Sequence, residues 1–85
     1  MRKDNYWQRI FKVIHKGDQY TVIVSMENIN AEDVISIRSF ANEFYLGEDI
    51  AFGGNRDRIY EFIKHMTQEY VNVVFSRLYF DQFGE

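Results

Sequence analysis

Residues 5–16 read NYWQRIFKVIHK, and the period of their apolar side chains decides how the chain begins. On a helical wheel the apolar side chains gather on one side and the polar ones on the other. The apolar side holds Tyr6, Trp7, Ile10, Phe11, Val13 and Ile14. A strand would instead place Arg9 and His15 among apolar side chains. We therefore predict a helix over 5–16, which Asp4 would cap and Gly17 would end.

The next segment, residues 19–26, changes to an alternating period that is typical of a strand. Its first face holds Tyr20, Val22, Val24 and Met26. Ile23 on the other face is apolar too, so we expect this strand to be covered on both sides.

Residues 30–46 predict a second helix. Asn30 stands at its N-cap with Asp33 three residues later, and Ile29 and Val34 occupy the positions of a hydrophobic staple. The inward stripe would hold Val34, Ile37, Phe40, Ala41, Phe44 and Tyr45. Residues 48–52 leave open a short edge strand.

A third helix is predicted to begin after Asn55, which would cap it. Its buried face would hold Ile59, Phe62, Ile63, Met66 and Tyr70. Beyond Tyr70 the helical sorting fails and β-branched residues dominate, so a strand is predicted over 71–80. Pairing of that strand within the chain or with another chain stays open.

These elements predict an α/β (α+β) fold in the order α-β-α-(β)-α-β, with a small sheet of two to three strands covered by three helices. We expect residues 1–85 to make one compact domain, because 46% of the side chains are hydrophobic and 18% aromatic. The expected core contains Trp7, Phe11, Val22, Val24, Phe44, Phe62, Ile63 and Met66.

Composition also restricts the chemistry. The chain has no cysteine, which excludes disulfides and thiolate metal sites and suits a reducing cytoplasm. Its apolar runs are too short for a membrane span, so we expect no membrane association. The first sixteen residues carry a net charge of about +4 and the remainder about −7, an asymmetry that suggests a charged partner.

Patterns for catalysis or metal binding are weak. His65 shares a predicted helix face with Glu61 and Glu69, but no nucleophile or further ligand accompanies them. A turn at Gly53 and Gly54 precedes a helix start, where anions can bind, yet neighbouring carboxylates oppose a phosphate. We therefore expect no metal, no cofactor and no enzymatic activity.

Surplus aromatic and acidic residues favour a protein-binding module. Tyr60 and Tyr79 are the candidate anchors, because tyrosine combines apolar area with a hydroxyl group. The candidate acidic residues, expected to steer the protein towards a basic surface, are Glu43, Glu48, Asp49, Glu61 and Glu69. In composition the chain resembles small cytoplasmic effectors of phages and mobile elements, including inhibitors and immunity proteins. That resemblance implies an inhibitor or regulator of a larger partner.

Two other interactions follow from the sequence. The alternative function is nucleic-acid binding by Arg9, Lys12 and Lys16 on the predicted first helix, although the acidic balance of the whole chain disfavours it. Self-association through a strand edge or through the aromatic C-terminal segment would produce a homo-oligomer such as a homodimer.

Overall fold

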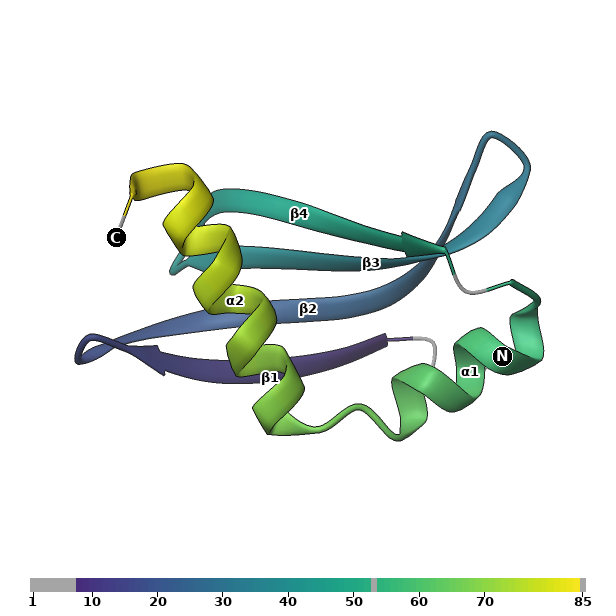
Figure 1. Ribbon diagram of the computed structural model, residues 1–85, viewed down its shortest axis with the longest axis horizontal. Helices are drawn as coiled ribbons and strands as arrows, with labels where there is room; N and C mark the ends of the chain where they lie inside the picture. The colour runs from purple at the N-terminus through teal and green to yellow at the C-terminus, as the bar shows by residue number, and fades with distance from the viewer. Residues whose placement is uncertain (1–7, 53, 85) are drawn as a thin grey trace.

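The computed structural model describes residues 8–52 and 54–84, which form four strands followed by two helices (Figure 1). The strands are β1 (Gln8–His15), β2 (Asp18–Ile29), β3 (Glu32–Ala41) and β4 (Phe44–Phe52). The helices are α1 (Arg56–Lys64) and α2 (Gln68–Phe83). All strand pairs are antiparallel and the sheet order is β1-β2-β3-β4, so β1 and β4 are its edges.

Three two-residue turns join the strands. Lys16 and Gly17 both have positive φ, as do Asn30 and Ala31, which is the backbone that a type I′ hairpin requires. Asn42 begins the third turn, also with positive φ. These short turns fix the register, because a slip by one residue would move every side chain to the other face of the sheet.

Both helices lie against the same face of the sheet, with α2 crossing from β1 to β4 (Figure 1). The side chain of Asn55 accepts a hydrogen bond from the Arg58 amide, and the side chain of Thr67 accepts one from the Tyr70 amide. These two bonds cap α1 and α2, respectively, and satisfy amides that have no partner within the helix.

The core lies between the sheet and the helices. Its largest fully buried side chains are Phe75, Ile59 and Ile63. From the sheet it takes Phe11, Val13, Tyr20, Val22, Val24, Ile35 and Ile37. Alternate residues of the strands supply this set, as expected for a sheet with one covered face.

The predicted order α-β-α-(β)-α-β is wrong, and so is the predicted number of helices. In place of the helix predicted over 5–16, residues 8–15 form β1, and residues 5–7 lie outside the described residues. In place of the helix predicted over 30–46, the chain forms β3 and the start of β4, with a turn before each. Arg9 and His15 favoured a helix over a strand in the first segment, because alternation places them among apolar side chains. Both do lie on the covered face, where Arg9 donates to the end of α1 and His15 packs against the rings of Phe75 and Tyr79.

The prediction of a strand over 71–80 is also wrong, because these residues lie inside α2. The predicted third helix ends at Lys64, and α2 begins after Thr67 with a new rotational phase. One continuous wheel therefore fails beyond Tyr70. The strand predicted over 19–26 lies within β2, and the open question over 48–52 is answered by β4.

Two members of the expected core are at the surface. Phe44 is 76% exposed and Phe62 is 40% exposed. Both were assigned to the inner stripe of a predicted helix, which does not exist for Phe44 and which has a different orientation for Phe62. Trp7 lies outside the described residues. The other five expected core residues are buried.

Candidate functional site

Arg9 points to the covered face of the sheet, which is the face packed against the helices. Its guanidinium group caps the C-terminal end of α1 there. Its Nη1 atom donates to the carbonyl oxygens of Ile63 and Met66 at 3.0 Å and of Lys64 at 3.1 Å. The same guanidinium lies 4.6 Å from the ring centre of Phe11. These carbonyls stand at the helix end, where a cation is favourable.

The basic helix face on which nucleic-acid binding was predicted does not exist. Arg9 is turned towards α1, whereas Lys12 lies on the opposite face of β1 and donates to the Thr21 hydroxyl at 3.2 Å. Lys16 belongs to the turn between β1 and β2. The three cations therefore do not form one continuous surface.

The second face of the sheet carries no covering element among the described residues; we call it the open face. One row across it consists of Ile10, Ile23, Arg38 and Glu48, as the strand register gives. Ile10 is 60% exposed, and Ile14, on the same strand, is 67% exposed. The open face thus combines apolar side chains over β1 with charged ones over β3 and β4.

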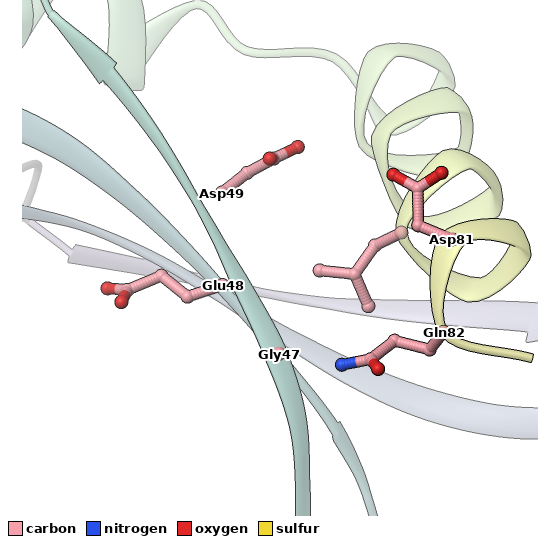
Figure 2. A pocket seen from close by; sticks show the side chains of 6 residues that line it. Gly47, Glu48, Asp49, Asp81 and Gln82 are labelled. Atoms are coloured by element: carbon pink, nitrogen blue, oxygen red, sulfur yellow. The ribbon is translucent and has the colours of Figure 1, made fainter.

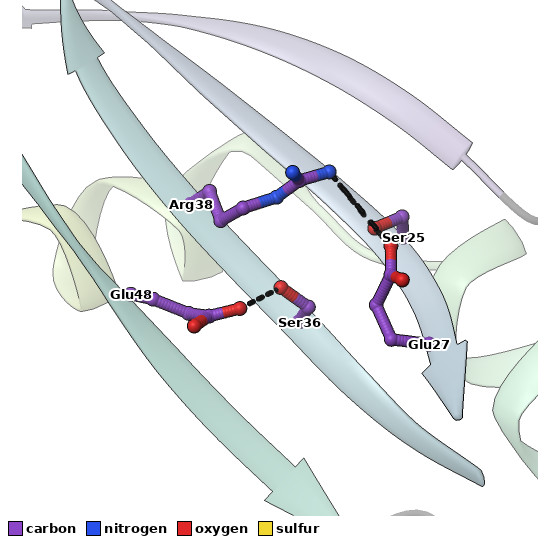
Figure 3. Close-up of polar contacts among 5 residues, drawn as sticks. All are labelled: Ser25, Glu27, Ser36, Arg38 and Glu48. Carbon is purple, nitrogen blue, oxygen red and sulfur yellow. Dashed lines mark hydrogen bonds and ion pairs between the residues drawn. The ribbon is translucent and has the colours of Figure 1, made fainter. Parts of the chain in front are cut away.

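Hydrogen bonds organise the polar part of the open face (Figure 3). Arg38 Nη2 lies 3.4 Å from the hydroxyl of Ser25, which donates to the Glu27 carboxylate at 2.9 Å. The Ser36 hydroxyl donates to the Glu48 carboxylate. Both serines are buried, so these contacts satisfy hydroxyls that would otherwise be costly to bury.

Two glutamines, one near each end of α2, form hydrogen bonds to the two edge strands of the sheet. Gln68 Nε2 donates to the Lys12 carbonyl of β1 at 2.8 Å, and Gln82 Nε2 donates to the Leu46 carbonyl of β4. A Cβ atom on Gly47 would lie 3.0 Å from Gln82 Nε2 and 3.2 Å from a methyl group of Leu78. Gly47 therefore permits the close crossing of α2 over β4.

Three exposed carboxylates surround the middle of β4. These carboxylates belong to Glu48, Asp49 and Asp81. They line a shallow surface pocket together with Gly47, Leu78 and Gln82. Figure 2 shows the Glu48 side chain on one side of the strand and Asp49 and Asp81 on the other. We call these three residues with strand β4 the acidic edge.

Among the residues proposed to bind a partner, Glu48 and Asp49 come together, whereas the other acidic candidates are dispersed. Glu43 is exposed in the turn before β4, and Glu69 is exposed in the first turn of α2. Glu61 pairs with His65 on α1, with 3.2 Å between Oε1 and Nε2.

The two candidate tyrosines are both half-buried. Tyr60 lies on α1, with the Lys64 ammonium 5.9 Å from its ring centre. Tyr79 belongs to an aromatic cluster in which its ring centre lies 4.5 Å from that of His15 and 4.7 Å from that of Phe83. Burial raises the pKa of the Tyr20 hydroxyl in the same cluster, and the neighbouring Tyr79 adds to this shift.

Sequence reasoning missed Arg38 and Asp81 as parts of these surfaces. Arg38 was placed on a predicted helix, and Asp81 followed a predicted strand. Only the pairing of β3 with its neighbours brings Arg38 to the open face, and only the helical state of residues 68–83 brings Asp81 to β4. Within the described ranges, no group of three His, Asp or Glu side chains is arranged to hold a metal ion.

Comparisons with protein-family models, with curated proteins and with solved structures find no significant match to this chain. Neither helix of the described part of the chain has the length and apolar character needed to cross a bilayer. The arrangement of residues is therefore the basis for the functional inference.

Proposed function

We propose that this protein is a non-enzymatic protein-binding module, and that it binds an extended basic segment of a larger protein along the acidic edge. The observation that carries this proposal is the position of β4. It is an edge strand with exposed carboxylates directed to both of its sides.

The backbone of β4 supplies the first part of the recognition. An edge strand leaves every second residue with an N–H and a C=O group directed away from the sheet. A partner segment in extended conformation can pair with these groups beyond Leu46, whose carbonyl already accepts from Gln82, and add a fifth strand. Main-chain pairing gives affinity without demanding a particular partner sequence.

The side chains supply the specificity. Successive residues of an added strand point to opposite faces, so basic residues on one face would meet Glu48 and those on the other would meet Asp49 and Asp81. Apolar residues of the segment would contact Tyr45 and Ile50, which are 57% and 39% exposed. Basic and apolar residues together are thus the chemistry that fits this edge.

The resemblance in composition to small phage and mobile-element effectors extends the proposal to biological role. We propose that the partner is a larger cytoplasmic protein and that binding inhibits or regulates it. An acidic module that covers a basic segment would block whatever anion that segment normally contacts.

A synthetic peptide tests the proposal. A labelled peptide in which pairs of lysines alternate with pairs of valines, so that both faces of the extended peptide carry lysine, is nine residues long like β4 and is titrated with the protein by fluorescence anisotropy at low salt. We expect binding that weakens with added salt and that weakens at least about tenfold in the double variant E48Q/D49N, because lysines on both faces of the peptide lose a carboxylate partner that is weakly screened at low salt. Glu61→Gln is the matched control, since Glu61 lies on α1 away from β4.

Four results would contradict the proposal. The first three are equal binding of the same peptide with glutamate in place of lysine, equal binding by E48Q/D49N, and no binding at low salt. A loss in E48Q/D49N that Glu61→Gln reproduces would show general charge attraction and no acidic edge.

A further inference from the structure

Helix α2 carries apolar side chains on its solvent side as well as on its buried side. Val71, Phe75 and Leu78 face the sheet and are buried. Val73 is 64% exposed and Phe80 is 58% exposed, on the side of α2 that faces away from the sheet. A helix that is apolar all round is normally covered all round.

The exposed residues follow a pattern specific to helix pairing. Val73, Ser76, Phe80 and Phe83 are separated by three, four and three residues, the spacing of the seam in a coiled coil. We call these four residues the α2 seam. All four are exposed, and Phe83 is 52% exposed. Scattered surface hydrophobics would not keep this spacing along one stripe.

We propose that the α2 seam binds the α2 seam of a second copy of this chain, with the two helices antiparallel and related by a two-fold axis level with Leu78. In this register the residue numbers of facing seam positions add to a constant. Phe80 of each copy then faces Ser76 of the other, and Phe83 faces Val73.

Size complementarity favours this partner over an unrelated helix. The small Ser76 leaves space between Val73 and Phe80, and the opposite Phe80 has the size to fill it, so a large residue meets a smaller one at each level. A parallel pair would place Phe80 against Phe80 and Ser76 against Ser76, which leaves one level crowded and the next empty.

The charges beside the α2 seam are compatible with this pairing. Arg77 and Asp81 lie on one flank of the α2 seam. The two-fold axis brings matching flanks together, and it places Arg77 of one copy about 3 Å along the axis from both Arg77 and Asp81 of the other, at about 1.5 Å per residue. On this flank the charges of the two copies therefore run carboxylate, cation, cation, carboxylate and sum to zero.

The four residues of the α2 seam are not part of the acidic edge, although Asp81 lies beside the seam and belongs to that edge. This proposal does not depend on the proposed function, because the dimer is tested without a peptide and through Phe80, which is not part of the acidic edge.

Sedimentation equilibrium of the full chain gives the first test. We expect a monomer–dimer equilibrium in the wild type, and a dimer dissociation constant at least about tenfold higher in Phe80→Asp, because a central aromatic anchor carries much of an interface. Phe44→Asp is the matched control, since Phe44 is even more exposed but lies on β4. A monomeric wild type at millimolar concentration, or equal weakening by both substitutions, would overturn the proposal.

Spin labels test the orientation without disturbing the seam. The chain has no cysteine, so Glu69→Cys and Asn72→Cys each provide one labelling site. The antiparallel register places residue 69 about 27 Å along the axis from its equivalent and residue 72 about 18 Å. We expect the pulsed-EPR distance to fall by several ångströms from Glu69→Cys to Asn72→Cys. Equal short distances at both sites would indicate a parallel pair, and absence of a dipolar signal would indicate no dimer; either result contradicts the proposal.

Discussion

The two faces of the sheet use the same four strands for different purposes. On the covered face, Val22 and Val24 are fully buried beneath the helices, whereas Ile10 and Ile14 on the open face are mostly exposed. Among the described residues of the covered face, Arg9 is bound by carbonyl groups at the end of α1. On the open face Arg38 contacts Ser25 and pairs with Glu27, while its buried Nε atom has no hydrogen-bond partner. Most of the buried apolar core therefore lies on the covered face, whereas the open face is buried around Val34 and Ser36 of β3 and exposes its apolar side chains on β1.

This contrast predicts that the largest loss of stability comes from substituting a buried side chain on the covered face. Phe75 is fully buried between α2 and the sheet. Phe75→Ala should lower the free energy of unfolding by about 3–5 kcal/mol, because it removes a large buried ring and leaves a cavity. Urea denaturation followed by circular dichroism measures this loss. A loss below about 1 kcal/mol would mean that α2 does not cover the sheet as described.

A smaller loss of stability is expected on the same face from removal of the charged side chain that caps the C-terminal end of α1. Arg9→Ala should lower the free energy of unfolding by about 2 kcal/mol, since it removes the hydrogen bonds from a charged donor to two carbonyls in the last turn of α1 and to the Met66 carbonyl after it. Lys12→Ala is the control, because Lys12 lies on the open face with one contact to Thr21. If both substitutions cost the same in urea denaturation, Arg9 does not hold α1.

The crossing of α2 over β4 gives a third comparison. Gly47→Val should cost about 1–3 kcal/mol, because the new side chain would overlap with Gln82 and Leu78. Gly17 is unsuitable as a control because its φ is positive, so Ile50→Val on the same strand serves instead. Thermal unfolding of the two variants reports the difference, and a Gly47→Val protein as stable as wild type would contradict the close approach.

The smallest effect is expected on the open face. Ile14→Thr should change the free energy of unfolding by about 0.5 kcal/mol or less, since Ile14 is 67% exposed and threonine suits a strand equally well. The matched substitution on the covered face is Val13→Thr on the same strand, which buries a hydroxyl and should cost more. Equal losses in urea would mean that both faces are covered.

Part of the fold could be predicted from sequence. Alternation in 19–26 predicted a strand, and Asn55 with the periodic residues after it predicted α1. The hairpin turns could not be separated from helix ends, because Gly17 and Asn30 suit both. Thr67 was a cap signal that we did not use, and without it α2 was divided between a helix and a strand.

The candidate site was predicted less well than the fold elements. Glu48 and Asp49 are neighbours in sequence, so their proximity required no tertiary information. Asp81 joins them only because α2 crosses β4, and Arg9 leaves the predicted basic surface only because α1 ends beside β1. Contacts between residues more than thirty positions apart decide both outcomes, and local periodicity carries no information on them.

Amide hydrogen exchange, measured by NMR with and without the lysine–valine peptide, tests most directly whether the acidic edge is the binding surface. In the free protein we expect the outward amides of β4 to exchange faster than those of the central strand β2, because an edge strand leaves them unpaired. On binding, new protection should be confined to β4, with β2 unchanged. Protection that appears instead on β1, or only on the helices, would contradict the proposed binding surface.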